Sequence, residues 1–191
     1  MKHLTHDERA RLHAACEASE ARTSARLVAV AVPVSDRYAL FPLVYAGVAG
    51  LTVVGAMALF WPALPLREAF FAAAVAAAVV AFVLDWLPLR LMSVPRHIKH
   101  AHARDMAHRA FAARILAQTD RKIGILLFVS LGERYVEVVT DRDVDLRVPQ
   151  ETWDAIIARF TAEAKNGRIA EGLLDATEAC TKVLEEHYPP A

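Results

Sequence analysis

The chain has 191 residues, with 22 basic and 22 acidic side chains, so its formal net charge is zero. This length gives room for one ordinary domain with an insertion or appendage, and zero net charge excludes a global field that would recruit nucleic acid. Apolar residues make up 55% of the sequence and charged residues 23%, but the charges are absent from its middle. We therefore consider the middle apart from its two flanks.

The N-terminal flank predicts a helix followed by a strand. Residues 1–24 are polar and helical in pattern, which predicts no cleavable signal peptide, and apolar positions at helical spacing within residues 7–24 predict a helix. Residues 26–34, RLVAVAVPV, are rich in valine and too short to cross a membrane, which favours a strand. Cys16 and Cys180, the two cysteines, lack CxxC or zinc-ligand spacing and are expected to be small core residues.

Two segments in the middle are candidate membrane spans. Residues 39–60 contain no charged side chain, and residues 69–84 contain none before Asp85. About 20 helical residues, at 1.5 Å each, cover the roughly 30 Å hydrocarbon core. The segments are joined by a short turn with two prolines and predict a transmembrane hairpin, with Trp61 and Trp86 at the two interfaces of the lipid bilayer. The alternative is a pair of buried helices in a soluble protein, but so small a chain has little surface to cover them.

The basic residues predict the orientation of this hairpin. Arg22, Arg26 and Arg37 precede the first span, and Arg90, Arg96, Lys99 and Arg104 follow the second, whereas Arg67 alone lies in the turn. Basic residues are enriched in cytoplasmic flanks, so we expect a two-span protein of the bacterial inner membrane with both termini cytoplasmic. The four basic residues after the second span are expected to contact anionic headgroups.

The C-terminal flank predicts a helix, two strands and two further helices. The expected ranges are 95–119 for a basic helix, 123–131 and 135–140 for strands joined by a turn at Gly132 and Glu133, and 149–165 and 169–187 for the closing helices. A two-stranded hairpin is unstable alone, so it needs residues 26–34 as a further strand. The expected fold is an α/β domain with a small mixed sheet of three to four strands flanked by helices. Its parts are residues 1–38 (helix and first strand), 39–89 (the inserted hairpin) and 90–191 (the remainder).

Three segments form one long pattern: GILLFVSLGERYVEVVTDRDVDL from Gly124, EARTSARLVAVAVPVSDRY at 20–38 and RHIKHAHARDMAHRAF at 96–111. This pattern resembles the TPM domain family, in particular a bacterial branch in which two transmembrane helices interrupt the domain. The resemblance implies a mixed sheet between helices, membrane association, and roles described variously as acid phosphatase, calcium-binding module, and assembly or repair factor. Extracytoplasmic members often have a glycine-rich turn where this chain has Thr140-Asp141-Arg142-Asp143, so a metal site of theirs does not transfer directly.

Asp141, Asp143 and Asp145 are the candidate metal ligands. In an extended chain they would point to one side, and three carboxylates on one side would suit a hard cation such as Ca²⁺. The segment is not an EF-hand, because Leu146 stands where that loop needs glycine. Two alternatives stay open: a solvated loop whose acids pair with Arg142 or Arg147, and a hydrolytic site. No nucleophile with a positioned base is readable beside the acids, which disfavours catalysis.

Two functions follow from these patterns. The first is a membrane-anchored accessory or assembly module that binds a membrane-protein partner, or forms a homo-oligomer, through its hairpin; Ala46, Gly47 and Gly50 would permit close helix packing there. The alternative is a weak metal-dependent acid phosphatase that uses the three aspartates. His100, Arg104 and His108 share one face of the basic helix, which favours a juxtamembrane helix over a metal site.

Overall fold

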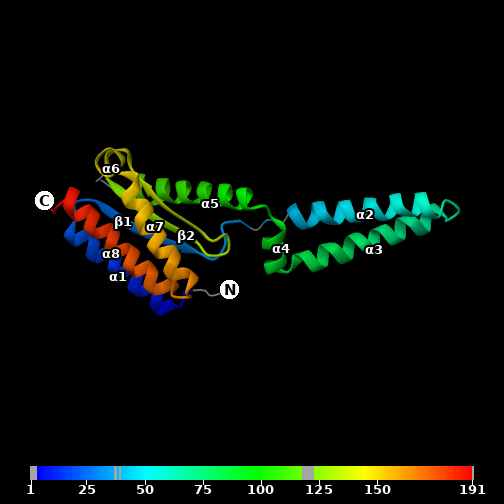
Figure 1. The fold of residues 1–191 in the computed structure, drawn as a ribbon, viewed down its shortest axis with the longest axis horizontal. Coiled ribbons are helices and arrows are strands. Elements are labelled where there is room, and N and C mark those ends of the chain that lie inside the picture. The colour runs from blue at the N-terminus through cyan, green and yellow to red at the C-terminus, as the bar shows by residue number, and fades with distance from the viewer. Residues whose placement is uncertain (1–3, 37, 39, 118–122, 191) are drawn as a thin grey trace. The chain divides into compact units, whose positions relative to one another are not determined.

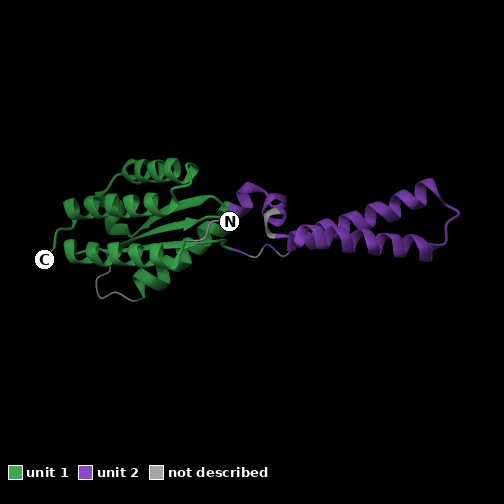
Figure 2. Ribbon diagram, turned by 90° about the horizontal axis from the view of Figure 1, so that it is seen from below, with its two compact units in different colours: residues 1–35, 100–191 green, residues 36–99 purple. Residues whose placement is uncertain are grey.

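The computed structural model describes residues 4–36, 38, 40–117 and 123–190, and these form two compact units (Figure 2). One unit comprises residues 1–35 and 100–191, and the other residues 36–99.

The first unit contains a three-stranded mixed sheet in the order β1-β2-β3 (Figure 1). The strands are β1 (Arg26–Val32), β2 (Gly124–Ser130) and β3 (Tyr135–Thr140). β1 pairs with β2 in parallel, with Arg26 opposite Gly124, and β2 pairs with β3 antiparallel. The predicted pairing of the strand before the apolar segments with the strands after them is therefore confirmed, as is the α/β fold class.

Helices cover both faces of this sheet. They are α1 (His6–Arg22), α5 (Arg96–Phe111), the π-helix η1 (Ala112–Leu116), α6 (Arg142–Arg147), α7 (Gln150–Lys165) and α8 (Ile169–His187). The basic helix predicted over 95–119 thus ends its α-helical part at Phe111, and its last two residues lie outside the described residues. All seven residues of β2 are buried, because this strand is central and covered on both faces.

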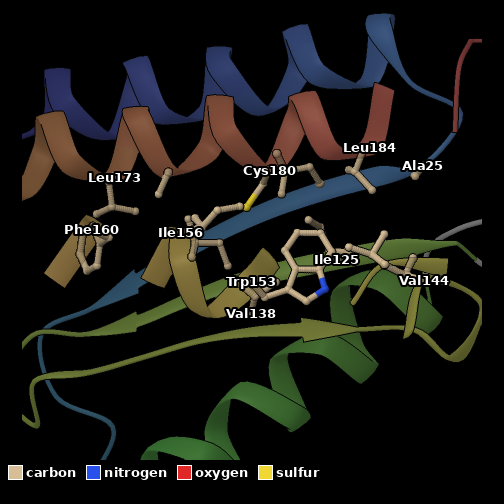
Figure 3. Close-up of a cluster of buried hydrophobic side chains, with 14 of the residues drawn as sticks. Ala25, Ile125, Val138, Val144, Trp153, Ile156, Phe160, Leu173, Cys180 and Leu184 are labelled. Carbon is tan, nitrogen blue, oxygen red and sulfur yellow. The ribbon is translucent and has the colours of Figure 1, made fainter. Parts of the chain in front are cut away.

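The larger core lies between the sheet and helices α1, α7 and α8. Figure 3 shows Trp153 of α7 beside Ile125 of β2, and Phe160 of α7 beside Leu173 of α8 farther along the same core. Alternate strand residues face the other way and form a second core with α5 and η1, which includes Phe128 and Ile115. Fully burying one such side chain contributes about 1.5–3 kcal/mol, so these cores hold the sheet between its helices. The prediction of a core position is confirmed for Cys180, whereas Cys16 is only half-buried.

The second unit is a helical hairpin, formed by α2 (Leu40–Phe60) and α3 (Leu66–Asp85), followed by the short helix α4 (Leu87–Ser93). Both long helices are long and apolar enough to cross a membrane, and only 6% and 11% of their most apolar windows are buried. A core helix of a soluble protein would be mostly buried. The second apolar segment does not continue beyond Asp85 as one helix, because Trp86 is extended and a new helix with a proline in its first turn follows.

Small residues bring the two long helices together. Ala46 of α2 and both Ala69 and Ala73 of α3 are buried. A Cβ atom at Gly50 would lie 3.4 Å from the carbonyl oxygen of Ala73, whereas one at Gly47 would have no atom within 4 Å. Gly50 therefore serves packing within the hairpin, and Gly47 lies on an open face.

Candidate functional site

The acidic segment after β3 is not extended. Asp141 is the N-cap of α6, and its Oδ1 accepts a hydrogen bond of 2.7 Å from the backbone N–H of Asp143. Asp143 and Asp145 then lie within the first turns of this helix. The expectation that the three carboxylates line one side of an extended chain is wrong, because an aspartate that caps a helix starts the helix at the next residue.

Neighbouring side chains engage the rest of this segment. The hydroxyl of Thr140 donates to the carboxylate of Asp145. Tyr188, near the C-terminus, donates its hydroxyl to the carbonyl oxygen of Asp143 at 2.9 Å, and the guanidinium of Arg147 lies 5.0 Å from the Tyr188 ring centroid. Burial raises the pKa of Tyr188, and Arg147 partly offsets that rise. These contacts fix α6 against the C-terminal end of the chain.

Metal binding by these aspartates stays a prediction. Among the described residues, no group of three or more His, Cys, Asp or Glu side chains is placed to hold a metal ion. Within the same residues, neither Asp141 nor Asp143 forms the predicted ion pair with Arg142 or Arg147, since Arg147 stacks on Tyr188 instead. A calcium site would therefore need these carboxylates to rearrange around the ion, which takes six to eight oxygen ligands.

A second polar cluster joins α5 to β3. The hydroxyl of Tyr135 donates to Glu137 Oε2 at 2.9 Å, and Glu137 Oε1 lies 3.7 Å from Arg104 Nε and 3.8 Å from His108 Nε2. The ring centroids of His100 and Tyr135 lie 5.3 Å apart. Burial and the hydrogen bond to Glu137 both raise the pKa of Tyr135. The predicted shared face of His100, Arg104 and His108 is present: Arg104 and His108 face Glu137 of β3, and His100 faces the ring of Tyr135.

Most of the residues predicted to contact the membrane are exposed. Trp61 is 61% exposed and Trp86 is 71% exposed. Arg90 forms an ion pair with Asp85, and Lys99 donates to the carbonyl oxygen of Leu91 at 2.9 Å. Arg96 is exposed, and the Arg104 side chain is 66% exposed beside Glu137. Their contact with headgroups stays a prediction.

Sequence reasoning missed the role of Glu133, which it placed only in a turn. Glu133 is 4% exposed. Its carboxylate accepts one hydrogen bond from the hydroxyl of Ser130 and another, of 2.8 Å, from the backbone N–H of Ser35. It therefore ties the chain leaving β1 to the turn between β2 and β3. No local pattern marks it, because Ser35 is 98 residues away in the sequence.

The two parallel strands β1 and β2 lie on either side of the apolar hairpin in the sequence. This arrangement defines the class of protein: an α/β domain with a candidate membrane hairpin inserted between two paired strands of its sheet. The family model of the TPM domain matches residues 88–183, about half of the chain, and the chain belongs to this family. The resemblance seen in the sequence is thereby confirmed. The matched residues include β2 and β3, whereas α1 and β1 lie before them.

Comparison with solved structures adds evidence on the fold alone. The chain is similar to the NMR structure of BA42 protein from the psychrophilic bacterium Bizionia argentinensis, with a TM-score of 0.57 and 14% sequence identity. The similarity covers 98% of this chain and 86% of that one. A search of curated proteins finds no match.

Proposed function

We propose that this protein is a membrane-anchored accessory or assembly module, which binds other proteins at the cytoplasmic face of the bacterial inner membrane. Its TPM domain supplies the binding surfaces, and its apolar hairpin supplies the anchor and contacts to a membrane-protein partner. The proposal goes beyond family membership, which fixes the domain and not its role.

The parallel pairing of β1 with β2 carries this proposal. β1 precedes the hairpin, β2 follows it, and the two strands pair over their full length. If α2 and α3 both cross the bilayer, the chain crosses twice and returns to the side it left, as this pairing requires. The anchor cannot be removed without cutting the domain, so the domain acts at the membrane surface.

Charge supports the cytoplasmic orientation. Arg22 pairs with glutamates of α8 and Arg26 lies beside Glu20, so both also serve the domain. Arg96 and Lys99 come soon after the hairpin and lack an ion-pair partner among the described residues, and such residues favour the cytoplasmic side. At the other end of the hairpin, the first turn of α3 offers Arg67 with Glu68 beside it.

The acid phosphatase alternative draws no comparable support. Asp141 caps α6 and Asp145 accepts the hydroxyl of Thr140, so both carboxylates have local structural partners. An accessory role needs no nucleophile and makes direct use of an exposed hairpin surface. Gly47 on the open face of α2 would let a partner helix approach closely.

Two measurements test the proposal. Tags at both termini should be protected from protease added to the periplasmic side, and cleavage of either tag from that side would refute the orientation. After mild detergent extraction, the chain should copurify with a second membrane protein or with further copies of itself. Gly47→Leu should reduce that recovery, whereas Val48→Leu, at a position already exposed and apolar, should not. Recovery of the monomer alone would refute the accessory role.

A further inference from the structure

Among the described residues, no strand pairs with the outer edge of β1. The strand order places β1 at one side of the sheet, with β2 as its neighbour. The N–H of Arg26 donates to Ile123, and the carbonyl oxygen of Val32 accepts from Leu131, so these residues direct their backbone groups toward β2. Backbone groups alternate in direction along a parallel strand, so Leu27, Ala29 and Ala31 direct theirs away from the sheet.

Cys16 of α1 lies beside this outer edge, together with Ala29. Burial raises the pKa of Cys16, and a backbone hydrogen bond from Ala29 partly offsets the rise. The N–H of Ala29 therefore points toward α1 at the outer edge and not toward β2. Sulfur is a weak acceptor, so a peptide carbonyl would be a better partner for this donor.

A groove of about 550 Å³ runs beside this edge. It is lined by residues 26–31 of β1, by α1 residues that include Leu12 and Cys16, and by Arg114 of η1. Ala29 and Ala31 contribute only methyl groups, which leaves space beside the strand. Apart from the contact of Ala29 with Cys16, no described residue pairs with these outward backbone groups. The groove thus offers them together with a mixed apolar and charged lining, as strand addition requires.

The charges in the groove define its occupant. Arg26 Nε lies 3.2 Å from Glu20, and His13 Nδ1 lies 3.3 Å from Glu17, so both glutamates have basic neighbours. Arg9 and Arg114 are exposed and, within the described parts of the chain, form no ion pair. The groove therefore has two available cations and favours a segment that brings carboxylates. A second copy of β1 does not fit this requirement, because RLVAVAV contains no acid.

We propose that an extended segment of a partner protein, with acidic residues alternating with small apolar ones, adds to β1 as a fourth strand. Its backbone pairs with Leu27, Ala29 and Ala31, and its carboxylates meet Arg9 and Arg114. This inference rests on the proposed function, because it names the surface through which the module binds a partner.

Photo-crosslinking in native membranes tests the site. A benzophenone amino acid at His13, on the rim of the groove, should capture one segment that contains acidic residues, whereas the same group at exposed Leu146 of α6 should not. Capture should be lost in Ala29→Pro, which removes an outward N–H without removing a bond to β2, and in the double variant Arg9→Glu/Arg114→Glu. Arg142→Glu, at an exposed position on α6, is a charge-reversal control outside the groove and should retain capture. Thermal melts verify that each variant folds.

A synthetic peptide with the captured sequence then tests the pairing on the purified full chain. Its binding should slow amide exchange of Leu27, Ala29 and Ala31 by about tenfold or more, should slow alkylation of Cys16, and should be about tenfold weaker in the double arginine variant at low salt. Absence of capture, capture of an acid-free segment or of a second copy, or unchanged exchange at these amides would overturn the inference. If the groove variants fold and still copurify the membrane partner in full, this inference fails while the proposed function stands; if the wild type copurifies nothing, the proposed function itself fails.

Discussion

In the α/β domain Trp153 is 1% exposed, whereas in the hairpin Phe82 is 84% exposed. This contrast is general: every large exposed apolar side chain among the described residues lies in the hairpin unit, except Leu116 and Leu146. A soluble protein rarely leaves so continuous an apolar surface uncovered. The two units therefore differ in the kind of surface that they expose, and comparable substitutions in the two units should have different effects.

The largest difference is expected when an aromatic side chain is removed from each unit. Trp153→Ala should destabilise the domain by about 3–5 kcal/mol, because it leaves a cavity at the centre of the larger core. Phe82→Ala should leave the domain stability unchanged. Pulse proteolysis in urea, on the chain in detergent, measures both. Equal losses would show that the hairpin surface is covered by the domain.

A charge placed on an exposed apolar position should be costly in the hairpin only. Val75 lies near the middle of α3 and is 49% exposed, and an arginine at the centre of a membrane span costs about 2.5–3.5 kcal/mol. Val75→Arg should therefore lower the membrane-inserted fraction, measured by carbonate extraction. Leu146→Arg in the domain, at a position 76% exposed, is the control and should have no effect. Full insertion of Val75→Arg would argue against a span.

Two glycines extend the comparison to packing. A Cβ atom at Gly124 would lie 2.7 Å from Ile115 Cγ2 and 2.9 Å from the carbonyl oxygen of Arg26, so the β1–β2 pair would have to shift. Gly124→Ala should cost about 1–3 kcal/mol of domain stability in the same urea assay. Gly47→Ala, with no atom within 4 Å, should change the stability of neither unit. A neutral Gly124→Ala would mean that η1 moves freely.

Substitutions of Asp141 distinguish a role in capping α6 from a role in binding a metal ion. Asp141→Ala should lower domain stability by about 1 kcal/mol through loss of the α6 cap, and Asp141→Asn should retain most of it, because asparagine also caps helices. If the aspartates bind Ca²⁺, millimolar Ca²⁺ should raise the melting temperature of the wild type but not of the variant in which all three are asparagine. An equal response of both would exclude these residues as ligands.

Much of the fold could be predicted because its signals are local. Each strand is a valine-rich or leucine-rich run, and one leftover strand had to complete a sheet that two strands could not stabilise alone. The acidic segment was misjudged because alternating aspartates suit both an extended chain and a helix that begins after a capping aspartate. The burial of Val144, which sets α6 against the core, decides between them. The buried Glu133 and the groove beside β1 depend on contacts between residues far apart in the sequence, which no local pattern reports.

The smallest effect concerns an ion pair at the exposed surface of the domain, where water screens charges as it cannot inside a bilayer. Arg22 forms hydrogen bonds to both carboxylate oxygens of Glu178, at 2.9 and 3.0 Å, and these lower the pKa of Glu178. A carboxyl group whose pKa is lower in the folded than in the unfolded chain stabilises the folded state at pH values above the unfolded-state pKa, which is about 4.3 for glutamate. That stabilisation is lost as the pH falls through the folded-state pKa. Arg22→Gln should return the Glu178 pKa, measured by NMR, toward its ordinary value and flatten the stability profile below pH 5. Arg159→Gln, the control, removes another exposed pair, with Asp175, and should leave the Glu178 pKa unchanged.

The effect of Arg22→Gln on the free energy of unfolding should be slight, because exposed ion pairs contribute little. An ordinary Glu178 pKa in the wild type would show that the pair with Arg22 does not persist in solution.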